Sequence, residues 1–234
     1  MKISGGNAMQ YEIFGGNLPA VTVKLNQGEA IYTQSGGMSW MTSGIQMETN
    51  MKGGLLKGLG RMLSGDSLFM ATYSAVAPNQ EITVASSFPG AIVPIDVSSG
   101  DIVVQKSAFL CAQPEVALSV HVVKGLGAGL FGGEGFILQR LSGNGLVFIE
   151  IDGAVCEKTL APGETLIVDT GNVAAYEANV GYEVTMIKGF KNMLFGGEGL
   201  LNTRLTGPGK VWLQTMTLPG FAGRIISFLP KSNN

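Results

Sequence analysis

Charge is scarce in this chain of 234 residues: Asp, Glu, Lys and Arg make up 14% of it, whereas a typical soluble domain has about 25%. The 17 acidic and 15 basic residues nearly cancel, which leaves a net charge of −2 at pH 7. That balance gives no general electrostatic attraction to nucleic acid. So few charges predict that part of the surface is covered by copies of the same chain or by partners.

Cysteine is also scarce, since Cys111 and Cys156 are the only two. Two isolated cysteines are too few for a disulfide framework or a thiolate zinc site. The sequence has no apolar run of the ~20 residues that a membrane-spanning helix needs. It also does not open with the basic and apolar segments of a secretory signal. These absences predict a cytoplasmic location.

Catalytic signatures are missing as well. The sequence contains no H-E-x-x-H, C-x-x-C, G-x-S-x-G or G-K-[ST] motif. His121 is the single histidine, and one histidine cannot complete a usual metal site alone. Cys111 with His121 would be a conceivable nucleophile pair, but Cys111 falls in an apolar run with no orienting acid nearby. We therefore expect a non-enzymatic protein with no cofactor, in which His121 is structural or exposed to solvent.

What the sequence has in abundance is glycine, at 35 residues, and short β-branched or aromatic runs separated by turn residues. Such runs at this spacing predict an all-β sandwich or barrel. The clearest runs are Val21–Leu25, Ala30–Thr33, Glu81–Ala85, Ile102–Gln105, Val116–Val123, Leu146–Ile151, Leu166–Asp169 and Val211–Thr215. Leu146 to Ile149 is apolar at both parities, so this strand is expected to be covered on both faces.

An internal repeat organises the chain. Phe131-Gly132-Gly133-Glu134-Gly135-Phe136 recurs as Phe195-Gly196-Gly197-Glu198-Gly199-Leu200, and Leu63-Ser64-Gly65-Asp66-Ser67-Leu68 is a weaker first copy. The spacing predicts three tandem β-sandwich repeats, at about 15–88, 89–159 and 160–230. We expect them to resemble double-stranded β-helices and to pack as one body, a single domain with pseudo-threefold symmetry. Residues 1–10 have no periodicity and are expected to form a flexible arm.

A turn motif repeats along with the acidic motif. Leu25-Asn26-Gln27-Gly28-Glu29 matches Leu160-Ala161-Pro162-Gly163-Glu164, and Ser87-Phe88-Pro89-Gly90-Ala91 matches them more loosely. Each segment is expected to form a tight turn that leads into a strand, with a glycine available for a positive φ.

In these motifs the sequence resembles the altered-inheritance-of-mitochondria family, long described as a domain of unknown function. The resemblance is carried by Met38-Ser39-Trp40, Met47-Glu48-Thr49, Leu63 to Phe69, Pro89-Gly90, Phe131 to Gly135, Leu160 to Glu164, Val168 to Gly171, Gly196 to Leu200 and Gly207 to Thr215. It implies a β fold similar to that of the tryptophan RNA-binding attenuation protein, repeated three times. It implies no established reaction and no catalytic residues, and the fungal member is associated with organisation of the mitochondrial inner membrane. Asp66 stands where the family usually has Glu.

Asp66, Glu134 and Glu198 are the candidate functional residues, because equivalent acids could converge if the repeats surround an axis. Converging carboxylates need a cation, shared protons or arginine partners, and calcium or magnesium would use such oxygens. Alternatively, each acid accepts hydrogen bonds from its own glycine turn or pairs with Arg140 or Arg204. We expect this second arrangement and no metal site.

Gly127-Ala128-Gly129-Leu130-Phe131-Gly132 matches the dinucleotide-binding pattern G-x-G-x-x-G, and Glu150 lies where a ribose-binding acid would be expected. A pyrophosphate, however, needs the N-terminus of a following helix. Here the next residues are Gly133-Glu134-Gly135 and a strand-like run. The match is therefore better interpreted as the second copy of the repeat.

Several basic and apolar residues leave alternatives open. Lys52, Lys57, Arg61, Lys124, Lys188 and Lys191 precede the acidic motifs and could contact RNA or anionic lipid, or simply face solvent. The apolar stripe from Leu55 to Leu63 has helical spacing. It could contact a membrane peripherally, although burial against the chain's own sheet or a sister subunit is favoured. Trp40 and Trp212 are expected in the core rather than as base-stacking platforms.

The sequence thus predicts a non-enzymatic, self-associating scaffold or interaction protein that forms a homo-oligomer. The alternative is a small-ligand- or RNA-binding regulator, by fold analogy to the tryptophan RNA-binding attenuation protein. The net charge does not favour a nucleic-acid partner.

Overall fold

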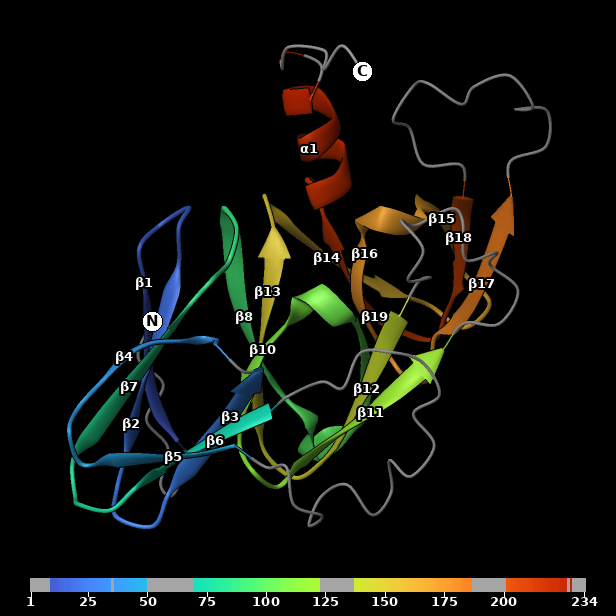
Figure 1. The fold of residues 1–234 in the computed structure, drawn as a ribbon. Helices are drawn as coiled ribbons and strands as arrows, with labels where there is room; N and C mark the ends of the chain where they lie inside the picture. The colour runs from blue at the N-terminus through green and yellow to red at the C-terminus, as the bar shows by residue number, and fades with distance from the viewer. Residues whose placement is uncertain are drawn as a thin grey trace. The chain divides into compact units, whose positions relative to one another are not determined.

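The computed structural model describes residues 9–34, 36–49, 70–122, 137–186, 201–226 and 228. In these ranges the chain is nearly all β, as the short apolar runs predicted (Figure 1). The strands before the middle of the chain are β1 (Gln10–Phe14), β2 (Ala20–Leu25), β3 (Ala30–Gln34), β4 (Met38–Met41), β5 (Ile45–Thr49), β6 (Met70–Ala75), β7 (Gln80–Ala85), β8 (Gly90–Asp96), β9 (Ile102–Gln105), β10 (Phe109–Ala112) and β11 (Val116–Val122).

The remaining strands are β12 (Ile137–Gly143), β13 (Leu146–Asp152), β14 (Val155–Leu160), β15 (Thr165–Asp169), β16 (Val173–Glu177), β17 (Gly181–Met186), β18 (Leu201–Thr206) and β19 (Gly209–Gln214). A short helix, α1 (Leu218–Ile226), follows them. All eight runs singled out in the sequence lie on strands, with ends that differ by at most two residues. The chain divides into two compact units, Met1–Glu150 and Ile151–Asn234.

The first unit contains a four-stranded sheet in the order β1-β2-β7-β4. A six-stranded sheet has the order β5-β6-β3-β10-β13-β8, and β11, β12 and β9 lie side by side. Two sets of six strands in this unit pair in the same way. β2 and β4 flank β7 while β3 and β5 flank β6, and all these pairs are antiparallel. In the second set, β8 and β10 flank β13 while β9 and β11 flank β12.

The second unit pairs its six strands by the same rule. β14 and β16 flank β19 while β15 and β17 flank β18, again antiparallel throughout. An irregularity of register also recurs. It falls between Met38 and Trp40 on β4, between Phe109 and Cys111 on β10, and between Val173 and Ala175 on β16. The fold of each set therefore follows one pattern of strand pairing.

The turns from Leu25 to Glu29 and from Leu160 to Glu164 match bond for bond. The side chain of Glu29 accepts from the N–H of Asn26 at 2.7 Å, and that of Glu164 accepts from the N–H of Ala161 at 2.8 Å. Gly28 and Gly163 have φ of +89° and +78°, the left-handed region where glycine is preferred. The looser match fails, because Gly90 begins β8 and its N–H donates to the Asn17 carbonyl instead.

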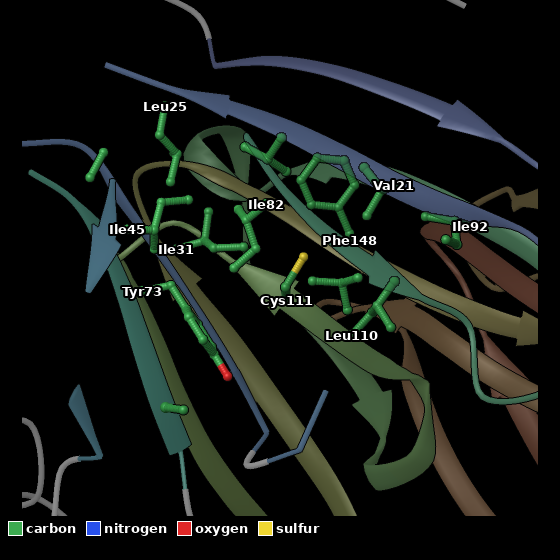
Figure 2. Packing of buried hydrophobic residues seen from close by; sticks show 14 residues of the cluster. Val21, Leu25, Ile31, Ile45, Tyr73, Ile82, Ile92, Leu110, Cys111 and Phe148 are labelled. Atoms are coloured by element: carbon green, nitrogen blue, oxygen red, sulfur yellow. The ribbon is translucent and has the colours of Figure 1, made fainter. Parts of the chain in front are cut away.

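The core of the first unit lies between its four-stranded and six-stranded sheets (Figure 2). Phe148 is fully buried there, and its ring meets that of Tyr11 edge-on at 5.0 Å between centroids. Val147 and Ile149 are fully buried as well. The expectation that this apolar strand is covered on both faces is therefore confirmed.

Candidate functional site

Most residues singled out from the sequence lie outside the described part of the chain. These are Asp66, Glu134 and Glu198, the glycine motif at 127–132, the apolar stripe at 55–63 and the six lysines and arginines that precede the acidic motifs. Arg140, considered as a partner for those acids, instead pairs with Asp101 at 2.7 Å. Among the described residues, no three His, Cys, Asp or Glu side chains are grouped so that they could hold a metal ion.

Cys111 and His121 lie on different strands, β10 and β11. Cys111 is fully buried, opposite Thr33 on β3 and Phe148 on β13. Burial raises the pKa of its thiol and keeps it protonated. Because the thiolate is the nucleophilic form, Cys111 is suited to packing rather than to attack. His121 pairs through its backbone with Leu138 of β12.

Glu150 has a structural environment of its own. It is only 8% exposed, and its carboxylate accepts hydrogen bonds from the Ser86 hydroxyl and the Ser87 N–H, both at 2.7 Å. The Ser87 hydroxyl lies 3.1 Å from the same carboxylate. A buried carboxylate with three such donors is well compensated, so Glu150 fixes the segment between β7 and β8. This role could not be predicted from the sequence, because the two serines lie far from Glu150 along the chain.

Gln214 fixes the corresponding segment between β13 and β14. Its side-chain oxygen accepts from the N–H of Asp152 at 3.2 Å, and its amide nitrogen donates to the Gly171 carbonyl at 2.8 Å. It is also 8% exposed. Glu150 and Gln214 occupy matching places near the ends of β13 and β19. One of the two side chains is charged and the other is neutral, so the strand pairing does not require a charge at this place. Both side chains provide an oxygen that accepts a backbone hydrogen bond.

A polar pocket of about 350 Å³ lies at one end of the four-stranded sheet. Lys24 and Glu81 form an ion pair across two of its strands, at 3.5 Å. Asn79, beside them, has a φ of +55°. The other lining residues are Met9, Gln10, Leu25, Asn26, Glu29 and Gln80. Charges of both signs with amide groups would suit a small zwitterionic or polar molecule.

The two tryptophans differ, and the expectation that both are core residues is half wrong. Trp212 on β19 is 4% exposed, as predicted. Trp40 is 56% exposed and lies on β4, the last strand of its sheet in the described part of the chain. Its ring lies 6.4 Å from that of Phe14, which is 42% exposed. These two rings form an apolar patch at the outer side of the sheet.

A second exposed apolar residue marks the other unit. Ile167 is 53% exposed on β15, the last strand of the three-stranded sheet β15-β18-β17. Among the described residues, Trp40 and Ile167 thus both lie on strands that pair with a single neighbour. An exposed apolar edge strand is a common site of pairing with another chain.

Helix α1 presents further apolar surface, because none of its residues is buried. Leu218, Phe221 and Ile225, spaced along one side of the helix, are 56%, 40% and 45% exposed. Arg224 is the charged residue in this helix. No helix in the described ranges is long and apolar enough to span a membrane.

Comparison with known proteins places these features in context. The model of a family described as mitochondrial biogenesis AIM24 matches residues 11–216. A Streptococcus pyogenes serotype M6 protein described as uncharacterized is 29% identical over 224 residues, which cover 92% of this chain and 89% of the relative. The X-ray crystal structure of another Streptococcus pyogenes protein has a TM-score of 0.77 at 26% identity. It covers 94% of this chain and 100% of its own.

Proposed function

This chain belongs to the mitochondrial biogenesis AIM24 family, and from that premise we propose that it is a non-enzymatic scaffold that associates with itself. The observation that carries the proposal is the pair of open sheet edges at β4 and β15, each with a large exposed apolar residue. Such edges are usually protected by charge, proline or a covering element. Neither β4 nor the first four residues of β15 contain a charged side chain. Trp40 and Ile167 therefore lie on edges that charge does not protect.

We propose further that the scaffold consists of three copies of one six-stranded β unit, related by a pseudo-threefold axis. Support comes from the strand pairing, which follows one rule in β2–β7, β8–β13 and β14–β19. The recurring irregularity at Trp40, Cys111 and Ala175 and the matching turns at Glu29 and Glu164 point the same way. In this arrangement the third copy begins with β14 at Val155, slightly before the boundary near 160 expected from the sequence.

Native mass spectrometry tests the self-association part of this proposal. The expected result is a species with two or more chains whose share grows with protein concentration. The location we propose is cytoplasmic, a compartment in which cysteines such as these two stay free. If the protein is a monomer at every concentration up to that found in the cell, the proposal of self-association is wrong.

A second candidate function is binding of a small polar ligand, and the pocket at Lys24 and Glu81 is the observation that favours it. This is the regulator that the fold analogy to the tryptophan RNA-binding attenuation protein suggests. Equilibrium dialysis with free tryptophan and filter binding with mixed-sequence single-stranded RNA, both at low salt, would test it. Binding that Lys24→Ala abolishes would support this function, and the absence of binding for both probes would exclude the two ligands.

Peripheral membrane contact is a third possibility for which α1 supplies an observation. Its apolar side and Arg224 suit an anionic lipid surface. Co-flotation with vesicles of mixed anionic and neutral lipids should then be lost in Phe221→Glu. Equal flotation of both proteins would place any lipid contact elsewhere.

A further inference from the structure

We propose that the outer face of the four-stranded sheet binds a neutral oligosaccharide. One sugar ring stacks on Phe14 and Trp40, and the neighbouring sugar forms hydrogen bonds in the pocket at Lys24 and Glu81. This ligand class rests on the small-ligand function proposed for that pocket and makes it specific. The site lies on the face of the sheet and does not use the backbone edge of β4.

The sheet β1-β2-β7-β4 turns one face to the core and the other outward (Figure 1). Val21 and Val23 of β2 are fully buried members of the core. Successive side chains of a strand point to opposite faces, so Thr22 between them points outward. Thr83 of β7 lies opposite Thr22, and the two hydroxyls are 2.7 Å apart. The outer face is therefore built on a pair of hydrogen-bonded threonines.

Two aromatic side chains flank this threonine pair. The register places Glu12, Thr22, Thr83 and Trp40 in one row across the four strands. Phe14 follows Glu12 by two residues on β1 and points to the same face. Phe14 is 42% exposed and Trp40 is 56% exposed, so both rings can be reached from solvent.

Phe14 and Trp40 form one platform above the two middle strands. Their strands are separated by β2 and β7, which places the two backbones about 14 Å apart. The ring centroids are nevertheless 6.4 Å apart, so the side chains lean toward each other across the sheet. A group enclosed between two rings needs roughly 7 Å for its two van der Waals contacts. The rings therefore make a surface for stacking and not a cage for a quaternary ammonium.

The pocket continues the same outer face. The next outward row across the first three strands is Gln10, Lys24 and Glu81, and these residues line the pocket. This row lies two residues from the row of Trp40, or about 7 Å along the strands. The side chains of Lys24 and Glu81 are 55% and 49% exposed. An apolar subsite and a polar subsite thus adjoin each other.

A sugar chain has the chemistry that these two subsites require. One face of a pyranose ring consists of C–H groups, which are attracted to the electron-rich face of an aromatic ring. Its rim carries hydroxyls, each of which donates and accepts hydrogen bonds. Gln10, Asn26 and Asn79 line the pocket with amide groups that also do both, and Glu81 adds a carboxylate acceptor. Planar groups of this kind can bind two neighbouring hydroxyls of one sugar.

The charge of the site favours a neutral ligand. Glu12 on the face and Glu29 and Glu81 at the pocket supply three carboxylates, against one ammonium from Lys24. This surplus of negative charge disfavours the phosphates of RNA and of anionic lipids. The core of a protein interface is depleted of charged residues, whereas here charged side chains adjoin the platform. A sugar therefore suits the face better than a second protein surface does.

Isothermal titration calorimetry tests the site, with neutral oligosaccharides of α- and β-linked glucose, mannose, galactose and N-acetylglucosamine. At least one of them should bind the intact protein. Phe14→Ala and Trp40→Ala should each weaken that binding about tenfold or more, because each removes half of the stacking platform. Trp40→Phe keeps an aromatic face and should weaken it by less than about threefold.

Met47→Ala is the matched control. Met47 is 52% exposed on β5, in the other sheet of the same unit, and its replacement should leave sugar binding unchanged. Because Phe14, Trp40 and Met47 are all exposed, the variants should unfold close to the urea midpoint of the intact protein. Loss of sugar binding in Met47→Ala as large as in Phe14→Ala would contradict the proposed site.

The outcomes separate the sugar site from the small-ligand function on which it rests. If none of the sugars binds while free tryptophan binds and Lys24→Ala abolishes that binding, the small-ligand function stands and the sugar site is wrong. If neither the sugars nor tryptophan bind, both lose their support. Choline binding that Trp40→Ala abolishes would assign the platform to a cation and overturn the sugar site. Sedimentation that shifts from oligomer to monomer in Trp40→Ala, with no sugar bound by the intact protein, would assign the platform to a second chain and overturn it as well.

Discussion

The backbone N–H of Ser87 donates a hydrogen bond to the carboxylate of Glu150 at 2.7 Å, between residues far apart in the sequence. The N–H of Asp152 is bound in the same manner by Gln214. In both cases a side chain near the end of one strand holds the segment that leads into the first strand of a six-strand set. Buried side-chain acceptors of this kind, rather than turn sequence alone, keep these connections in place.

Replacement of Glu150 by alanine should be costly. It would leave the N–H and the hydroxyl of Ser87 without their acceptor at a site that is 8% exposed, while the Ser86 hydroxyl would keep the Phe88 carbonyl as an acceptor at 2.9 Å. We expect a loss of about 2–3 kcal/mol in the free energy of unfolding, measured by urea denaturation. Glu150→Gln is the matched control and should cost clearly less, since Gln214 serves the matching place. Equal losses for the two variants would mean that the charge itself is required.

Glycine at the two matching turns should be needed for its backbone alone. A Cβ at Gly28 or Gly163 would meet no atom within 4 Å, but φ is +89° and +78°. Gly28→Ala and Gly163→Ala should therefore each lower the free energy of unfolding by about 1 kcal/mol. Gly100→Ala is the control, because its site is equally open and its φ of 163° is extended. A loss at Gly100 as large as at the turns would refute this reason.

Tyr182 should make stability depend on alkaline pH. Burial is the main cause that raises the pKa of its hydroxyl to about 12 from 10.0, with a hydrogen bond from Thr203 acting in the opposite direction. The folded protein holds this proton more tightly than the unfolded chain does. The stability that the protonated hydroxyl contributes is therefore complete below pH 10 and is lost as pH rises to about 12. Chemical denaturation at several pH values should show a decline that is smaller in Tyr182→Phe. Parallel declines in both proteins would contradict this assignment.

The two thiols should differ in reactivity. Cys156 is exposed, whereas Cys111 is buried and burial raises the pKa of its thiol. In the native protein a thiol reagent such as Ellman's should therefore label one cysteine, and after denaturation two. Cys156→Ser should show no rapid labelling until it unfolds. Rapid labelling of that variant in native buffer would place Cys111 at the surface.

The sequence was informative about strands because their signals are local. Apolar alternation and turn residues located β2, β7, β13 and β15 to within one or two residues. The burial of the strand around Phe148 on both faces could also be predicted, because apolar residues at odd and even positions leave the strand no polar face. The turn closed by Glu29 and its match at Glu164 followed from repetition of the same five-residue motif.

What the sequence could not supply depends on neighbours that fold beside a residue. Trp40 and Trp212 both lie in strand-like runs, but Trp212 is 4% exposed on an inner strand, whereas Trp40 is 56% exposed on the last described strand of its sheet. Glu150 was weighed as a ribose-binding acid because of a glycine pattern upstream, whereas its actual partners are Ser86 and Ser87. Asp66, Glu134 and Glu198 lie outside the described residues, so their role stays a prediction.

The central claim is that the edge strands β4 and β15 take part in association between chains. Amide hydrogen exchange in these two strands, followed over a range of protein concentrations, tests it most directly. The account predicts that exchange in both Met38–Met41 and Thr165–Asp169 slows as concentration rises, and that Ile167→Lys removes the slowing. Exchange in these strands that is equally fast at every concentration would contradict it.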